Sequence, residues 1–121
     1  MKKNKNYKIS IITVVKNSVT TIEKCIKSVI DQNYKNIEYI IIDGNSNDGT
    51  SKIIDKYKDK ISVIVRENDK SIWDAMNKGV ELANGEIIGF LNADDFYYPI
   101  ALEIVNRYFD ENNIDFLFGS V

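Results

Sequence analysis

Hydrophobic residues along this chain alternate between two spacings, and the alternation predicts the secondary structure. Short, nearly continuous β-branched runs such as ISIITVV at 9–15 are typical of strands covered on both faces. Such runs lie at residues 9–15, 37–42, 61–65, 86–91 and 114–118. Between them, apolar residues recur three or four positions apart, which indicates helices with one buried face. The apolar sets are Ile22, Cys25, Ile26, Val29 and Ile30; then Ile53, Ile54 and Tyr57; then Trp73, Met76, Val80 and Ala83; and last Leu102, Val105, Tyr108 and Phe109.

Residues suited to helix ends flank these segments. Thr20 and Glu23 have the spacing of a capping box, in which each side chain binds a backbone amide at the start of a helix. Thr50 and Ser71 are expected to cap the second and third helices. Pro99, the single proline, suits the first turn of the fourth helix.

Strand followed by helix, repeated four times and ending on a strand, predicts an α/β fold. The 21 residues between the first two strands are enough for a helical crossover between parallel strands. We expect one domain over residues 1–121, built as an open, mainly parallel Rossmann-like sheet with helices on both faces. The expected strand order is 3-2-1-4-5. Because the last strand candidate continues as FLFGSV at 116–121 directly to the chain end, we expect the chain to be the first part of a longer protein.

Composition limits the chemistry that this chain can perform. Its 121 residues include 16 Lys and Arg, 18 Asp and Glu, no His and one Cys. The lack of histidine excludes His-ligated zinc and a Ser-His-Asp triad. Cys25 cannot form an internal disulfide, and its place on a helical apolar face predicts a core residue. A net charge of −2 argues against nucleic acid as a partner. Without a membrane span or a signal-peptide pattern, a cytoplasmic location is expected.

Polar residues gather where the predicted strands end, which in open parallel sheets is the edge that binds ligands. The loop DGNSNDG at 43–49 follows the second strand and can equally be ordinary turn sequence. Asp94 and Asp95 follow the fourth strand, where adjacent carboxylates repel each other unless a cation is close. Mg²⁺ and Mn²⁺ prefer such oxygen ligands and leave positions for substrate phosphate. The pair therefore points to a hard divalent cation.

Four stretches together give the chain a family resemblance. They are ISIITVVKN at 9–17, DGNSNDGT at 43–50, DKSIWDAMNKG at 69–79 and GEIIGFLNADDF at 85–96. In this order they resemble the nucleotide-sugar-binding half of family 2 inverting glycosyltransferases with the GT-A fold. The resemblance implies an enzyme that moves a sugar from a nucleotide-diphosphate sugar donor, expected to be a UDP-sugar, to a glycan or lipid-linked acceptor. It also implies Mn²⁺ or Mg²⁺ as the cofactor.

The same resemblance implies roles for individual residues. Asp95 matches the aspartate that ligates the metal, and Asp94 matches the preceding position, near the ribose and diphosphate. Asp43 matches the acid that reads the nucleobase. Two positions depart from the family pattern. Asn92 stands where many relatives have a first aspartate, and Lys16 stands where relatives often have tyrosine.

Further residues match the walls of the donor site. Val14 matches the end of the first strand, where the base packs, and Lys70 and Ser71 match a loop that approaches the donor from the other side. Trp73 can be a core or rim residue or a sugar-stacking one. Asp74 can complete a helix cap with Ser71 or contact the donor.

None of the residues here matches the family's catalytic base, which lies well beyond the paired aspartates. The resemblance therefore implies that this chain holds only the donor-binding half and transfers no sugar alone. Any peripheral membrane association would then come through a missing C-terminal part. A non-catalytic nucleotide-binding module is one alternative. A nucleotidyltransferase is another, although VVKNS at 14–18 lacks the glycines of a phosphate loop.

Overall fold

The computed structural model describes residues 4–115 and residue 117, and it confirms the alternation of strands and helices. The strands are β1 (Ile9–Val15), β2 (Ile37–Asp43), β3 (Val63–Arg66) and β4 (Ile87–Phe90). The helices are α1 (Ile22–Ile30), α2 (Thr50–Lys56), α3 (Ile72–Leu82) and α4 (Ala101–Glu111), with a 3₁₀ helix η1 at Lys58–Lys60. Two of the five residues of the predicted fifth strand at 114–118, those at 116 and 118, lie outside the described residues. The other three, Ile114, Asp115 and Leu117, do not belong to a strand.

The strands form one parallel sheet in the order β3-β2-β1-β4. β1 and β2 pair over their whole length, from Ile9 beside Ile37 to Val15 beside Asp43. β4 pairs with the other side of β1, and β3 with the outer side of β2. The order predicted for the first four strands is confirmed. Parallel pairing also places the carboxyl ends of these strands at a common edge.

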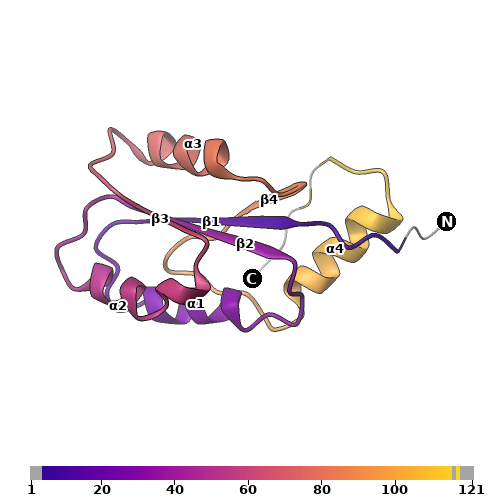
Figure 1. Ribbon diagram of the computed structural model, residues 1–121, viewed down its shortest axis with the longest axis horizontal. Coiled ribbons are helices and arrows are strands. Elements are labelled where there is room, and N and C mark those ends of the chain that lie inside the picture. The colour runs from indigo at the N-terminus through magenta and orange to yellow at the C-terminus, as the bar shows by residue number, and fades with distance from the viewer. Residues whose placement is uncertain (1–3, 116, 118–121) are drawn as a thin grey trace.

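Helices cover both faces of the sheet, with α1 and α2 below it and α3 above it in Figure 1. Ile9, Ile11 and Val15 point into the cluster between the sheet and α1, whereas Ile12 points the other way and packs with Ala75 of α3. β1 is therefore buried on both sides, which explains its continuous apolar sequence. None of the helices within residues 4–115 has the length and hydropathy that a transmembrane span requires.

Small side chains allow α3 to lie close to the sheet. Ala75 and Gly79 are its buried residues, and a Cβ on Gly79 would stand 2.5 Å from Cγ2 of Ile12. The apolar face predicted for this helix is only partly correct, because Trp73 is 70% exposed and Val80 is 42% exposed. Trp73 is therefore not a core residue, since the close approach requires small residues at the contact, and the rim and sugar-stacking alternatives for Trp73 both stay open.

The start of α1 differs from the prediction. Thr21 is its N-cap residue, and no side-chain hydrogen bond caps the helix. Glu23 turns away from the helix start and accepts hydrogen bonds from Nζ of Lys56 and the hydroxyl of Tyr57, each at 2.7 Å. The capping box of Thr20 and Glu23 is therefore wrong, because Glu23 is held by partners from the region of α2.

Two other helix starts also differ in detail. α2 follows Gly49, whose φ of 104° is left-handed, and Thr50 is the first helical residue instead of the cap. Oδ1 of Asp48 accepts the N–H and the hydroxyl of Thr50, at 3.0 and 2.6 Å. Pro99 lies in a turn just before α4, which begins at Ala101, and not within its first turn.

Candidate functional site

The candidate site lies at the edge where the parallel strands end. Val15, Asp43 and Arg66 are neighbours in register at the ends of β1, β2 and β3. β4 ends earlier, level with Ile12, and the N–H of Leu91 still donates to the carbonyl of Ile12 at 3.0 Å. The segment after β4 therefore runs on along β1 and brings the paired aspartates to the same edge.

Asp94 and Asp95 lie in a tight turn after β4, in which the N–H of Asp95 donates to the carbonyl of Asn92 at 3.0 Å. Asp94 is exposed and Asp95 is partly buried. Neither carboxylate has a hydrogen-bond or ion-pair partner among residues 4–115 and 117. Free carboxylate oxygens of this kind suit a hard divalent cation. The described residues contain no cluster of three or more acidic or Cys ligands, so such an ion would take its remaining ligands from substrate and water.

Asp43, by contrast, is completely buried and bound within its own loop. Its Oδ1 accepts the N–H and the hydroxyl of Ser46 at 2.9 and 2.7 Å, and its Oδ2 accepts the hydroxyl of Ser51 at 2.6 Å. Nε of Arg66 lies 3.6 Å from Oδ2, and the same guanidinium also pairs with Asp55. The carboxylate thus joins the end of β2 to the start of α2 and to β3.

Side chains also join the loops that follow β1 and β2. The N–H of Asn17 donates to Oγ of Ser46 at 2.8 Å, and Oδ1 of Asn17 accepts the N–H of Asn47 at 2.8 Å. Asn17 and Asn45 have φ values of 52° and 68°, a region in which Asn is enriched. Ordinary turn chemistry, the alternative for residues 43–49, therefore accounts for much of this loop.

Lys78 of α3 holds the loop between β3 and α3. Its Nζ lies 2.5 Å from Oδ1 of Asp69, 2.8 Å from Oε1 of Glu67 and 3.5 Å from Oδ2 of Asp74. Hydrogen bonds with Asp69 and Glu67 raise the pKa of Lys78 above its usual value, so it remains charged. The ammonium group of Lys78 therefore holds three carboxylates together beside the candidate site.

Ser71 caps α3 as predicted. Its Oγ accepts the N–H of Asp74 at 3.1 Å, while Oδ2 of Asp74 accepts the N–H of Lys70 at 3.2 Å. This reciprocal pair favours the helix-cap interpretation of Asp74 over a donor contact. The ammonium group of Lys70 has no ion-pair partner within the described part of the chain.

Lys16 and Gly44 lie close together just after the ends of β1 and β2, and Val14 is the last residue but one of β1. Val14 is partly buried and packs with the residues that face α3. A Cβ on Gly44 would lie 3.4 Å from Oδ2 of Asp69 and 3.5 Å from Cδ of Lys16. In the sheet, β2 with Asp43 at its end lies on one side of β1, and β4, which Asp94 and Asp95 follow, lies on the other side. Val14 is in β1 itself, and Asp69 of the loop before α3 reaches the end of β2.

Cys25 lies behind the aspartate turn. Its thiol donates to the carbonyl of Asn92 at 3.4 Å and lies 3.8 Å from Oγ1 of Thr13 and from the hydroxyl of Tyr39. Burial raises the pKa of the Cys25 thiol and of the Tyr39 phenol. Both groups remain protonated at neutral pH, and the prediction of a buried core cysteine is confirmed.

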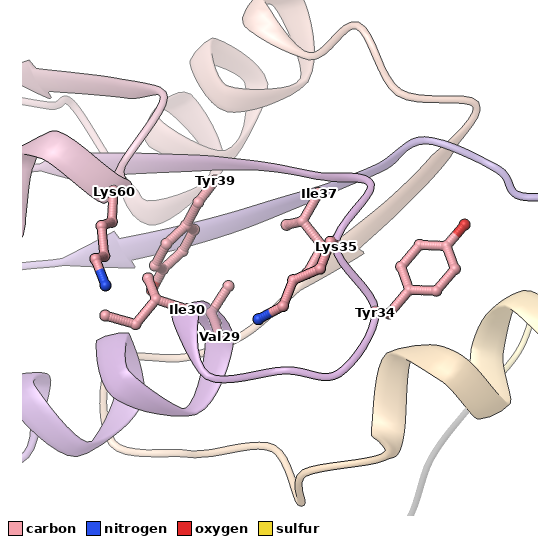
Figure 2. A pocket seen from close by; sticks show the side chains of 7 residues that line it. All are labelled: Val29, Ile30, Tyr34, Lys35, Ile37, Tyr39 and Lys60. Atoms are coloured by element: carbon pink, nitrogen blue, oxygen red, sulfur yellow. The ribbon is translucent and has the colours of Figure 1, made fainter.

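Two surface pockets lie outside this edge. One has a volume of about 200 Å³ and lies at the amino end of β2. Figure 2 shows Lys35 and Lys60 beside its apolar and tyrosine side chains. The other, of about 520 Å³, lies between α1 and the segment after the aspartates. There, Nζ of Lys24 is 3.9 Å from the centre of the Phe96 ring. The first pocket is at the opposite end of the strands from the aspartates.

Sequence comparison identifies the family to which these features belong. The model of Glycosyl transferase family 2 matches residues 10–121, nearly the whole chain. The chain belongs to glycosyl transferase family 2. The resemblance inferred from the four sequence stretches is therefore confirmed.

Named relatives of this family 2 chain are longer proteins. It is 33% identical, over 116 residues, to an Escherichia coli protein named UDP-Glc:alpha-D-GlcNAc-diphosphoundecaprenol beta-1,3-glucosyltransferase WfgD. That match covers 95% of this chain and 46% of WfgD. The family 2 chain spans less than half the length of the curated relatives that it matches.

Solved structures confirm the predicted fold class, an open α/β sheet of the GT-A type. S. aureus TarS 1–349 in complex with UDP-GlcNAc is 25% identical, with a TM-score of 0.81 over 88% of this chain and 32% of TarS. The mannosyltransferase PcManGT from Pyrobaculum calidifontis, in complex with GDP-Man and Mn²⁺, has a TM-score of 0.71 over 78% of this chain and 29% of its own. At 22% identity, PcManGT shows similarity of fold alone.

The pairing of Asp69 with Lys78 is the part of this family 2 site that sequence reasoning missed. The two residues are nine positions apart, and their contact depends on how the β3–α3 loop folds back over α3. The only local signal is the four-residue spacing of Asp74 and Lys78, which is typical of a helical ion pair.

Proposed function

We propose that this family 2 chain binds a UDP-sugar through a divalent cation, for transfer of the sugar with inversion to a glycan or lipid-linked acceptor. The name of WfgD states a UDP-Glc donor and a diphosphoundecaprenol acceptor, and TarS was solved with UDP-GlcNAc, which supports both classes. The observation that carries the proposal is the free pair of carboxylates, Asp94 and Asp95, at the edge where the strands end. A cytoplasmic location, at the inner face of a membrane that holds the acceptor, belongs to the same proposal.

Asp95, with Asp94 beside it, would hold Mn²⁺ or Mg²⁺. The two side chains fit such an ion because they offer oxygen ligands that no other described residue occupies. PcManGT, which shares the fold, was solved with Mn²⁺. When bound, the cation would offset the negative charge that grows on a departing diphosphate.

The rest of the donor would lie across the end of β1. Val14 offers partly buried apolar surface against which a base can pack. Lys70 adds a positive charge, and Ser71 fixes the backbone of the facing loop by capping α3. Asp94 would lie near the ribose and diphosphate. These residues bind and orient the donor, and none of them is assigned the role of general base.

Calorimetric titration of the chain with UDP, in Mn²⁺, in Mg²⁺ and in EDTA, tests the proposal. Binding should be stronger with either cation. Asp95→Ala should remove the metal-dependent part, since loss of one carboxylate from a site with few protein ligands costs about 2–4 kcal/mol. Asn92→Ala is the matched control, because an uncharged amide in the same turn contributes at most a hydrogen bond of about 1 kcal/mol.

Two results would contradict this assignment. Binding that is equally strong in EDTA would remove the cation from the site, and failure to bind any nucleoside diphosphate would remove the donor. Equal losses for Asn92→Ala and Asp95→Ala would mean that Asp95 is not the ligand.

The second candidate function is that this chain binds the donor but does not itself transfer the sugar. It is favoured because the chain spans less than half the length of WfgD. Incubation with UDP-Glc and UDP-GlcNAc, with detection of released UDP and of glycosylated acceptor, separates the two functions. Slow hydrolysis without transfer is expected. Robust transfer would show that a catalytic base lies within these 121 residues.

A further inference from the structure

Asp43 offers no exposed oxygen to a ligand. Its side chain is 0% exposed, and both carboxylate oxygens accept hydrogen bonds from Ser46 and Ser51. A nucleobase can reach this carboxylate only if the loop after β2 opens and those bonds break. The resemblance assigns base recognition to Asp43, but the folded loop gives it a positioning role.

Asp69 presents a free carboxylate oxygen at the same wall. Its side chain is only 10% exposed, and Nζ of Lys78 holds its Oδ1 at 2.5 Å. Oδ2 accepts no hydrogen bond from the described residues. Since no buried polar side-chain atom among these residues is left unpaired, Oδ2 must reach solvent. A nearly buried side chain thus keeps one acceptor open.

The open oxygen lies over the end of β2. It stands 3.4 Å from the position that a Cβ on Gly44 would take, and the aliphatic part of Lys16 is 3.5 Å from that same position. Any larger side chain at residue 44 would fill the space beside Oδ2. Because residue 44 is glycine, it places no side chain against this carboxylate oxygen at the ends of β1 and β2.

The sheet order decides which part of a nucleotide this oxygen meets. β4, with Asp94 and Asp95 after it, lies on one side of β1, and β2 lies on the other. A nucleotide with its diphosphate at Asp95 would cross the end of β1 and place its base near Gly44. A carboxylate there would repel phosphate and attract an N–H donor.

We infer that Asp69 is a specificity-determining residue whose Oδ2 accepts a hydrogen bond from the ring N–H of a uracil base, with Lys78 as its positioning residue. This inference rests on the proposed function. Uracil carries a hydrogen on N3, where cytosine has a lone pair. The carboxylate therefore accepts a hydrogen bond from UDP and meets a second acceptor in CDP, so the site should prefer UDP.

Titration of the chain with UDP and with CDP, both in Mn²⁺, tests the inference. Asp69→Asn should weaken UDP binding about tenfold, because a hydrogen bond to a charged acceptor is replaced by one to an amide. The same variant should bring the ratio of UDP to CDP affinity close to one, because the amide can donate to N3 of cytosine as well as accept. Asp69→Glu, which keeps the charge, should retain the preference for UDP.

Glu67→Gln is the matched control. It removes another carboxylate from Lys78, but Glu67 is not among the groups beside Gly44. Its ratio of UDP to CDP affinity should equal that of the unmodified chain. Circular dichroism of each variant checks that the helices and sheet are retained.

The outcomes separate this inference from the proposed function. If the unmodified chain binds UDP with Mn²⁺ and Asp69→Asn leaves the ratio unchanged, or lowers UDP and CDP binding equally, the inference is wrong and the proposed function stands. If the unmodified chain binds no nucleoside diphosphate, both are wrong.

Discussion

Replacing Asp43 with alanine should destabilise the fold, because this buried carboxylate holds three hydrogen-bond donors from two segments. The variant leaves the N–H and hydroxyl of Ser46 and the hydroxyl of Ser51 without their acceptor. Each such bond contributes about 1 kcal/mol, so the expected loss is about 3 kcal/mol. That is a large fraction of the roughly 5–15 kcal/mol by which a domain of this size is stable.

Urea unfolding followed by far-ultraviolet circular dichroism measures this loss as a lower midpoint at an unchanged slope. Asp55→Ala is the matched control. Asp55 pairs with the same Arg66, but its side chain is 53% exposed, so its removal should cost less than about 1 kcal/mol. An unchanged midpoint for Asp43→Ala, or equal losses for the two variants, would refute the assignment of Asp43 as the residue that holds the loop.

Two further predictions concern the packing of α3 and the start of β2. Gly79→Ala should lower the melting temperature, because a Cβ 2.5 Å from Ile12 destabilises the contact by about 1–3 kcal/mol. The higher helix propensity of alanine offsets only about 1 kcal/mol of this loss. An unchanged melting temperature would mean that α3 shifts freely. Burial alone would raise the pKa of Glu38, but hydrogen bonds from Asn84 and Ser10 outweigh it and lower the pKa below the ordinary 4.5. The stabilisation is therefore present above that value and is lost as the pH falls through the folded-state pKa, so the unfolding free energies of the unmodified chain and Glu38→Gln should converge as the pH is lowered from neutral to well below 4.5. A constant difference across that range would contradict this account.

The central strands are predictable from sequence because they are buried on both faces. β1 and β2 pair over seven positions, and their apolar runs match the observed bounds to within one residue. β3 and β4 have four residues each and are shorter than the runs at 61–65 and 86–91. Within the part of the chain that the structure describes, each pairs with a neighbour on one side only, and its apolar sequence extends beyond the paired residues.

Side-chain partners that are distant in sequence are not predictable in this way. Glu23 has the spacing of a capping residue, but Lys56 and Tyr57, more than thirty positions away, occupy its carboxylate. Likewise, small residues such as Gly79 determine which side of α3 faces the sheet. A prediction from hydrophobic residues relies on large ones such as Trp73, which is exposed. Local sequence contains neither of these tertiary contacts.

The candidate site shows the same division. The positions of Asp94 and Asp95 after β4, and of Asp43 after β2, follow from strand order and parallel pairing. What each carboxylate can bind depends on its partners. Asp43 is fully buried and is bound by Ser46 and Ser51, whereas Asp69, which is not among the site residues predicted from sequence, keeps one oxygen without a hydrogen-bond donor among the described residues.

The exposure of Trp73, the single tryptophan, has a practical consequence. Its indole is 70% exposed in the folded chain, so its emission should already resemble that of a solvated indole and should change little when the chain unfolds. Trp73 is also in the first turn of α3, two residues after Ser71, which ends the 69–71 loop. Its fluorescence should therefore respond to a nucleotide docking on that loop while remaining nearly silent to global unfolding. Trp73 would then serve as an intrinsic optical probe that separates occupancy of the proposed donor site from stability of the fold.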